Sequence, residues 1–248
     1  MPFEDHFSDA GEAYRRFRPG YPPELFGFLG SLVPAGGSVW ECGAGSGQAT
    51  EGLARAFTRL FVTDPSHSQL RLADPRLGWR VACTAEAAPL PARCVDLVVV
   101  AQALHWIAHG TFFAEVRRVA RPGAVLAVWT YGLPRPGGGF DPEIADFARG
   151  TVGRFWPPGR RHVEEAYGSI DFPFEELDAP TLEMTADLEL ADFLGYVRTW
   201  SAVRRARATS AADPVDALER AWIGRWPAGD ARRVRWPLTL RAFRVRRG

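Results

Sequence analysis

Apolar and polar positions along the first half of the chain predict short buried strands separated by helices. Five apolar runs have the length of strands, at 38–42, 59–64, 80–83, 95–101 and 124–131, and helices are predicted around 53–56, 66–74 and 110–120. The sequence Arg121-Pro122-Gly123 is predicted to end the third helix and to turn into the fifth strand. Strand and helix at this spacing predict right-handed βαβ units, and therefore an α/β fold with a mostly parallel sheet.

Both ends of the chain depart from this regular pattern. Residues 1–30 predict a helical cap interrupted by prolines, and residues 132–178, rich in Gly, Pro and aromatic residues, predict a lid inserted after the fifth strand. A strand at 181–190, helices over 191–229 and a last strand at 237–246 are predicted to follow. We interpret residues 1–248 as a single domain in which 132–178 and 191–229 are substrate-side insertions.

Composition narrows the class of protein. The hydrophobic share of 46% is ordinary for a globular enzyme, and a formal net charge of +1 favours neither nucleic acid nor an anionic membrane as a partner. No apolar run is long enough to span a bilayer, and the first residues lack a secretion signal. We therefore expect a cytoplasmic monomer or homodimer that acts on a small molecule.

Cysteine and lysine usage excludes several chemistries. Three cysteines without a C-x-x-C spacing argue against a disulfide framework and against a metal site. All 30 basic residues are Arg, which excludes Schiff-base chemistry on lysine and a phosphate-binding P-loop lysine.

A glycine loop follows the first predicted strand. Glu41 stands at the end of that strand, and Gly43, Gly45 and Gly47 come next, so the backbone can turn sharply and approach a ligand closely. The spacing is acid-x-G-x-G-x-G and not the G-x-G-x-x-G expected for a dinucleotide. A carboxylate at Glu41 repels a diphosphate but attracts an ammonium group, although a tight turn without a ligand remains an alternative.

The second strand ends at Asp64, at nearly the distance from the glycine loop at which an acid meets a ribose diol. A carboxylate there can accept hydrogen bonds from both hydroxyl groups. The alternative is helix capping, since Pro65 suits the first position of a helix.

Six ordered blocks between about Tyr14 and Trp129 resemble the class I methyltransferases that depend on S-adenosylmethionine (SAM). The blocks are YRRFRPGYP (14–22), VWECGAGSGQAT (39–50), VTDPS (62–66), AEAAPLP (85–91), VDLVVVAQALHW (95–106) and VRRVARPGAVLAVW (116–129). More narrowly, they resemble the group of the trans-aconitate and ubiquinone/menaquinone methyltransferases. The resemblance implies a Rossmann-like, seven-stranded sheet with an antiparallel last strand, and SAM across the carboxyl ends of the strands.

The resemblance also implies roles in binding SAM. Residues assigned to the methionine part are Glu41, Gly43, Ala44 and Gly45, with Ala101 and Gln102 beneath the sulfonium and Arg18 and Tyr14 near the carboxylate. Residues assigned to the nucleoside are Asp64 for the ribose and Pro65, Thr84 and Ala85 for the adenine. Many relatives carry Asp where Thr84 stands, so a hydroxyl group or Glu86 is expected to replace that contact.

Methyl transfer mainly requires that the enzyme align the acceptor with the methyl donor and exclude water. A general base is needed only for acceptors that must lose a proton, and His105, just past the fourth strand, is the candidate. The alternative for His105 is packing. Trp106, Trp129 and Tyr131 are candidate substrate residues, and the aromatic lid favours an acceptor that is apolar, aromatic or carries a carboxylate.

Three other functions compete with a small-molecule methyltransferase acting on O, N or C. An NAD-dependent oxidoreductase is disfavoured by the glycine spacing and Glu41. A non-catalytic SAM-binding protein has no need of an aromatic lid. A base-flipping nucleic-acid methyltransferase often carries an Asn/Asp-Pro-Pro-aromatic block where this chain has AQALHW.

Overall fold

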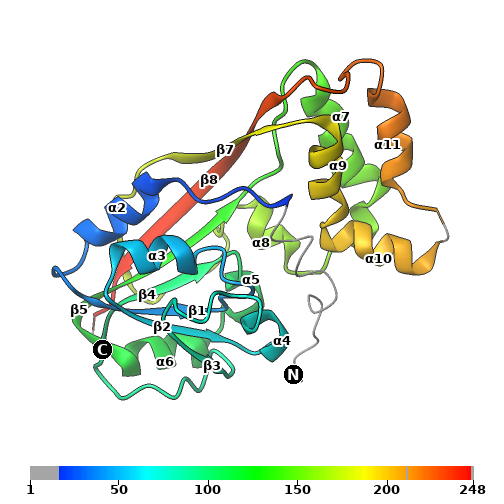
Figure 1. The fold of residues 1–248 in the computed structure, drawn as a ribbon. Coiled ribbons are helices and arrows are strands. Elements are labelled where there is room, and N and C mark those ends of the chain that lie inside the picture. Colours follow the sequence, from blue (N-terminus) through cyan, green and yellow to red (C-terminus); the bar gives the residue numbers. More distant parts are fainter. Residues whose placement is uncertain (1–16, 211, 247–248) are drawn as a thin grey trace.

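The structure, a computed structural model, describes residues 17–210 and 212–246. Its centre is a sheet of eight strands (Figure 1). The strands are β1 (Ser38–Cys42), β2 (Arg59–Asp64), β3 (Trp79–Ala82), β4 (Val95–Ala101), β5 (Ala120–Tyr131), β6 (Glu175–Leu177), β7 (Leu182–Leu188) and β8 (Arg232–Arg244). The α/β fold predicted from the sequence is confirmed.

The strand order is β3-β2-β1-β4-β5-β8-β6, with β7 also paired to β8. Strands β1 to β5 pair in parallel, and β8 runs antiparallel to β5. Both β6 and β7 pair antiparallel with β8, β6 along Ala242–Arg244 and β7 along Arg232–Leu238. The predicted seven positions and the antiparallel last strand are therefore present, and the eighth strand arises because β6 and β7 share one edge of β8.

Helices cover both faces of the sheet. They are α2 (Pro23–Ser31), α3 (Thr50–Ala56), α4 (His67–Leu70), α5 (Leu104–Ile107), α6 (Gly110–Val119), α7 (Phe140–Asp146), α8 (Arg160–Glu164), α9 (Leu190–Arg198), α10 (Ser201–Thr209) and α11 (Val215–Trp222), with a π-helix at Phe147–Thr151 and a 3₁₀ turn at Gly153–Phe155. Alternate residues of β4 face opposite cores: Leu97 and Val99 lie with α2 and α3, while Val98 and Val100 lie with α6. A strand buried on both faces explains the continuous apolar run at 95–101.

A second group of helices lies beyond the carboxyl end of β5. Strand β8 extends past that end, since Tyr131 pairs with Leu238 and β8 begins six residues earlier. Figure 1 shows β7 and β8 leading to the group formed by α7, α9, α10 and α11. The rings of Phe140, Phe193, Trp222 and Trp226 pack together inside it. The predicted insertions 132–178 and 191–229 thus contain helices that pack on one another, and their rings belong to the same hydrophobic cluster as α2, α3 and one face of the sheet.

Several element boundaries differ from the prediction. The sequence Arg121-Pro122-Gly123 does not separate a helix from a strand, because β5 already begins at Ala120 and pairs with Val95. The register then shifts before Leu97 pairs with Val125, so the extra residues form a bulge, with Gly123 at φ 80°. Helix α4 is only His67–Leu70, and β8 starts at Arg232 instead of 237.

Among the residues that the structure describes, no helix is both long enough and apolar enough to cross a membrane.

Candidate functional site

The glycine loop joins β1 to α3 at the carboxyl edge of the sheet. Gly43, Gly45 and Gly47 have φ values of 72°, 57° and 86°, a backbone region that favours glycine. A Cβ on Gly43 would lie 2.7 Å from the Cβ of Ala103, and one on Gly47 would lie 2.7 Å from the Cβ of Ala73. A Cβ on Gly45 would meet nothing within 4 Å. Packing therefore requires the first and third glycines, while the second borders open space.

Asp64, at the end of β2, fastens this loop. Its Oδ2 accepts a hydrogen bond from the backbone N–H of Gly45 at 2.8 Å, and its Oδ1 accepts one from the N–H of Ser66, also at 2.8 Å. The N-cap of α4 is Ser66, whose hydroxyl accepts from the N–H of Gln69. Ser66 and not Asp64 therefore caps α4. The carboxylate of Asp64 lies directly beside Gly45, and Pro65 follows Asp64 in the chain.

Glu41 is fully buried at the end of β1. Its Oε2 accepts a hydrogen bond of 2.6 Å from the Thr50 hydroxyl, while its Oε1 has no hydrogen-bond partner among the described residues. Burial raises the pKa of this carboxyl from 4.5 to about 8; the Thr50 hydrogen bond opposes that shift and the charge of Asp64 adds to it. A cation placed at Oε1 would remove this penalty, as an ammonium group of a ligand would.

The turn after β4 contacts the glycine loop through Ala103 and carries Gln102. Gln102 follows Ala101 and has φ 57°, which is unusual for a residue with a side chain. Its backbone N–H donates to Trp129 O at 2.9 Å, and its Oε1 accepts from the Thr130 hydroxyl at 3.1 Å. Its Nε2 is buried and has no partner among the described residues. A strained residue with an unused donor beside the glycine loop marks a functional site.

His105 lies in α5, with its ring 4.8 Å from that of Trp106 and 6.5 Å from that of Tyr167, measured between centroids. Burial, and to a smaller degree the charges of Arg160 and His162, lower its pKa to about 3. The imidazole is therefore neutral at physiological pH, and its Nδ1 has no partner in the described part of the chain. Trp106, also in α5, is 39% exposed.

Comparison with known proteins gives the family. The family model for a methyltransferase domain matches residues 40–128, and a methyltransferase of Dictyostelium discoideum is 32% identical over 205 residues, covering 80% of this chain and 78% of that protein. The chain belongs to the class I SAM-dependent methyltransferases. The predicted activity class and its methyl donor, SAM, are thereby confirmed.

Two further relatives place this methyltransferase more closely. A solved structure described as a type II methyltransferase from Anaeromyxobacter dehalogenans is 43% identical, with a TM-score of 0.85, covering 92% of this chain and 98% of that one. An uncharacterised methyltransferase of Mycobacterium tuberculosis is 40% identical over 126 residues, which are 50% of this chain and 51% of that protein. The narrower likeness to trans-aconitate and ubiquinone/menaquinone methyltransferases stays a prediction.

The three residues after β3 that were assigned to the adenine differ in exposure and in pairing. Of the three residues after β3 that were assigned to adenine, Thr84 is exposed and Ala85 is buried. Glu86 forms an ion pair with the Nε2 of His109 at 2.9 Å. Glu86 therefore faces His109 in this structure, and an adenine contact by Glu86 would require it to leave that pair.

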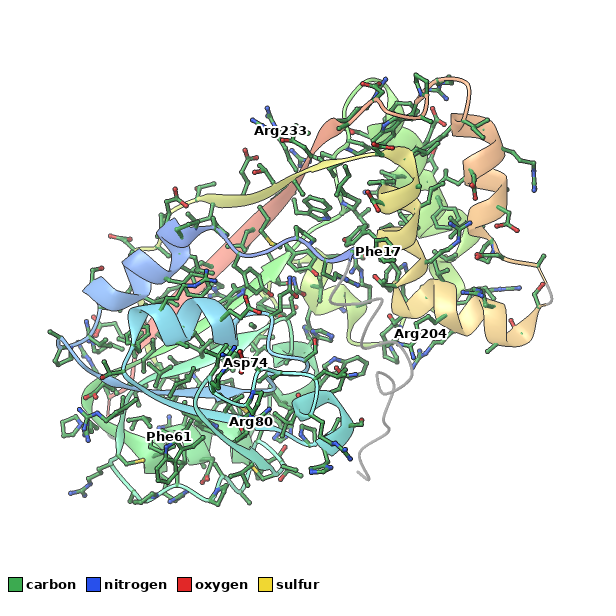
Figure 2. The ribbon with its side chains drawn as sticks, viewed as in Figure 1. Phe17, Phe61, Asp74, Arg80, Arg204 and Arg233 are labelled. Atoms are coloured by element: carbon green, nitrogen blue, oxygen red, sulfur yellow. The ribbon has the colours of Figure 1, made fainter. Side chains whose placement is uncertain are left out.

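The N-terminal segment connects the glycine loop to α9. Gln48 donates from Nε2 to Pro19 O at 2.5 Å, and the ring of Phe17 lies so close to α9 that a Cβ on Gly195 would come within 2.7 Å of it (Figure 2). Arg18 donates to the Thr199 hydroxyl at 3.2 Å and to the Tyr131 hydroxyl, and its guanidinium lies 4.9 Å above the Tyr196 ring. Tyr14 lies outside the described residues.

The aromatic side of the site is mostly buried. Trp129 is fully buried, meets the ring of Tyr21 edge-on at 5.5 Å, and has no partner for its indole N–H among the described residues. Tyr131 is 5% exposed and joins Arg18. The structure therefore brings Trp129, Tyr131 and Arg18 together, while Trp106 lies apart from them on α5.

Sequence reasoning missed Tyr167 and Thr130. Tyr167 follows α8, is 1% exposed and has φ 62°, and its hydroxyl group has no hydrogen-bond partner among the described residues. Thr130 was hidden within the apolar run of β5. Nothing in the local sequence distinguishes Tyr167 from the other aromatic residues of the lid, because its role depends on contacts distant in sequence.

Proposed function

We propose that the protein transfers the methyl group of SAM to an O, N or C atom of a small molecule that is apolar, aromatic or carries a carboxylate. The observation that carries this proposal is the group of Gly45, Asp64 and Glu41. Gly45 leaves open space, and Asp64 places a carboxylate beside it. Glu41 adds a buried carboxylate oxygen without a partner. Together these groups suit a nucleoside that bears an ammonium group.

Different residues at the carboxyl edge of the sheet would bind different parts of SAM. Glu41 Oε1 would receive the ammonium group, and the backbone from Gly43 to Gly45 would border the methionine part. Each oxygen of Asp64 accepts a backbone hydrogen bond, and a carboxylate oxygen can accept more than one, so Asp64 would also accept from the ribose hydroxyls. Pro65, Thr84 and Ala85 would meet the adenine.

Arg18 is placed to assist at the other end of the methionine part. Its guanidinium contacts the Tyr131 hydroxyl, the Thr199 hydroxyl and the Tyr196 ring, and a guanidinium is the side chain best suited to bind a carboxylate. The proposed role of Arg18 is to bind the carboxylate of SAM, with Tyr14 beside it.

Bound SAM supplies a methyl group already activated on a sulfonium, so the protein has to align the acceptor and exclude water. The buried rings of Trp129 and Tyr131 would form an apolar wall against a flat acceptor. Trp106, exposed on α5, would reach the acceptor only if the substrate extends to that side. His105 stays a candidate base, although an imidazole with a pKa of about 3 is a weak one.

The test is the affinity for SAM of the Asp64→Ala variant, measured by calorimetry. We expect a loss of about tenfold or more, because charge-assisted hydrogen bonds to the ribose and the fastening of Gly45 are removed together. Asp187→Ala is the matched control, since it removes a carboxylate that pairs with Arg233 on the exposed β7–β8 ribbon. Unchanged affinity in a folded Asp64→Ala protein would contradict the ribose assignment, and absence of heat in the unmodified protein would contradict the proposal as a whole.

A further inference from the structure

Three polar side chains from three separate segments meet where β4 and β5 end. Gln102 follows β4, Thr130 lies near the end of β5, and Tyr167 comes from the segment after α8. Thr130 donates its hydroxyl hydrogen to Gln102 Oε1 at 3.1 Å. Burial raises the pKa of the Tyr167 hydroxyl, and the nearby Thr130 hydroxyl and Leu104 backbone only partly offset this effect. The three residues form a continuous buried polar group.

The backbone holds both ends of this group in unfavourable conformations. Gln102 has φ 57°, and Ala166 and Tyr167 have φ values of 51° and 62°. The Tyr167 N–H donates to His162 O at 2.7 Å, and Arg241 donates to Tyr167 O at 2.6 Å. Non-glycine residues adopt this conformation at a cost in free energy, so the positions of the Gln102 and Tyr167 side chains lower the stability of the fold.

Two polar atoms of the group lack a hydrogen bond of normal geometry. Gln102 Nε2 and the Tyr167 hydroxyl are buried without such a bond among the described residues, although the Tyr167 hydroxyl lies beside the Thr130 hydroxyl and the Leu104 backbone. Burial of an unpaired donor is unfavourable, and such atoms in native proteins call for an explanation. Gln102 adjoins Ala103, which borders Gly43 of the glycine loop. Gln102 therefore belongs to the turn that borders the proposed place of the methyl donor.

The two hydroxyl groups of this cluster, those of Thr130 and Tyr167, are not bases at neutral pH. His105, in the helix that follows Gln102, is the candidate base, and burial lowers its pKa to about 3. Tyr167 is kept protonated, because burial raises its pKa. A site with donors and no strong base suits an acceptor that needs no deprotonation.

We propose that Gln102 Nε2 holds the methyl-accepting atom, that this atom is an oxygen anion, and that Thr130 and Tyr167 are positioning residues that orient the Gln102 amide. The inference rests on the proposed function and assigns the acceptor side of the same site. A lone pair of the oxygen anion forms the new bond to the methyl carbon, the bond between carbon and sulfur breaks with its electrons going to sulfur, and no proton moves. Carboxylates and phenolates are the two sources of such an anion.

The test compares the unmodified enzyme with Gln102→Glu on two matched probes, 2-naphthoate and 2-naphthol. Glutamate keeps the shape and the acceptor of the Thr130 hydrogen bond but replaces the Nε2 donor by an oxygen anion. We expect kcat/KM to fall about 100-fold, mainly through KM, because a charge-assisted hydrogen bond becomes a repulsion. Affinity for SAM, measured by calorimetry, should not weaken, which separates this proposal from failure of the cofactor site.

The two probes distinguish the sources of the anion. Turnover of 2-naphthoate is expected to be independent of pH, and turnover of 2-naphthol is expected to rise about tenfold per pH unit below its phenolic pKa of about 10. Activity on one probe alone identifies the carboxylate or the phenolate as the acceptor. Faster methylation of neutral 2-naphthol by Gln102→Glu would overturn the proposal, since the new carboxylate would then be acting as a base that the site requires.

A second measurement does not depend on turnover. In ¹⁵N-labelled protein loaded with S-adenosylhomocysteine, the side-chain amide signals of Gln102 are those that Gln102→Glu lacks. Addition of 2-naphthoate or of ionised 2-naphthol should shift these signals. Signals that neither probe moves at millimolar concentration would overturn the proposal.

Tyr167→Phe tests the positioning residue. The variant keeps the ring and removes a buried hydroxyl that has no hydrogen bond of normal geometry but lies beside Thr130, so the melting temperature should stay the same or rise. We expect kcat to fall about tenfold with little change in KM, because the acceptor is bound but less well aligned. A lower melting temperature with unchanged kcat would show a purely structural role and overturn this part of the proposal.

Discussion

The two sides of the site differ in how they are built. On the cofactor side, residues close in sequence satisfy one another: Asp64 fastens Gly45, and Ser66 caps α4. On the acceptor side, Gln102 and Tyr167 come from distant segments and leave buried polar atoms unpaired. Among the described residues, Glu41 Oε1 is the one unpaired buried oxygen of the cofactor side. We infer that a ligand pairs with the unpaired atoms of the acceptor side.

The largest expected effect tests the cofactor side through Gly45. Alanine at Gly45 would keep a left-handed φ and place a methyl group in the open space of the loop. Gly36 is the matched control, because it has φ 72°, a Cβ added to it would meet nothing within 4 Å, and no proposed ligand contact involves it. Both Gly45→Ala and Gly36→Ala should lose about 1–2 kcal/mol of stability. Only Gly45→Ala should also weaken SAM binding, by about 100-fold, a loss near 2.7 kcal/mol for a blocked contact.

Calorimetry with SAM and thermal melts of both variants give the comparison. Equal SAM affinities in the two variants would show that the space at Gly45 is not occupied by the cofactor. In that case the glycines would serve the turn alone.

The cofactor side could be predicted from the sequence because each of its features is local. The strand ends at Glu41 and Asp64 and the spacing of Gly43 and Gly45 are visible in short segments. In the structure, Gly45 donates to Asp64, whose charge also acts on Glu41. The parallel sheet could be predicted for the same reason, since a buried strand such as 95–101 forms a continuous apolar run. The structural reason for Gly43, a close approach to Ala103, could not be seen.

Apart from Gln102, which the sequence analysis assigned beneath the sulfonium, the acceptor side could not be predicted, because tertiary contacts bring its members together. Tyr167 matters through its approach to Thr130 and through Arg241, which holds its backbone from β8. The bulge at the start of β5 was missed for a related reason, since Arg121-Pro122-Gly123 has the sequence of a turn but lies inside β5, between the pairs that Ala120 and Val125 form with β4. Glu86 was expected at the adenine, and its ion pair with His109 likewise joins distant segments.

A second prediction tests the acceptor side through the strain at Gln102. Gln102→Gly relieves φ 57° and removes the side chain, and Arg93→Gly relieves φ 56° at an exposed position as a control. Each change should stabilise the fold by about 1 kcal/mol, which raises the melting temperature by about 2–4 °C in a chain of this size. Only Gln102→Gly should lose methyl transfer, by about tenfold or more in kcat/KM.

Differential scanning calorimetry and a radiolabelled-methyl assay check the two variants. A drop of several degrees for Gln102→Gly would mean that the side chain supports the fold, and the acceptor role would lose its main argument. Equal activity in both variants would have the same consequence.

A third and smaller effect concerns the one unpaired atom of the cofactor side. Because burial raises the folded-state pKa of Glu41 from 4.5 to about 8, the group contributes stability below pH 4.5 that is lost as pH rises through 8. Binding of an ammonium group at Oε1 favours the ionised form, so SAM binding should release a proton. The affinity for SAM should therefore increase by up to about tenfold per unit between about pH 6 and 7.5.

Glu41→Gln should abolish this pH dependence and weaken SAM binding by about tenfold at the upper end of the range. It should also make the apoprotein less sensitive to pH, since glutamine carries no charge to bury. Calorimetry in buffers of different ionisation enthalpy measures the released proton directly. A flat affinity profile in the unmodified protein would place the ammonium group elsewhere.

The smallest expected effect is at His105, on the boundary between the two sides. Burial lowers its pKa to about 3, so its folded-state protonation does not change between pH 5 and 8 and cannot produce a step in kcat near 6.5. His105→Phe keeps an aromatic ring against Trp106 and Tyr167 and removes an unpaired Nδ1. We expect kcat within about threefold of the unmodified enzyme, far below the 100-fold or more that loss of a general base causes. A larger loss of kcat, together with a pH profile that loses its acidic limb, would show that His105 is the base. Methyl transfer would then require loss of a proton from the acceptor, which contradicts our inference that the acceptor is already an anion.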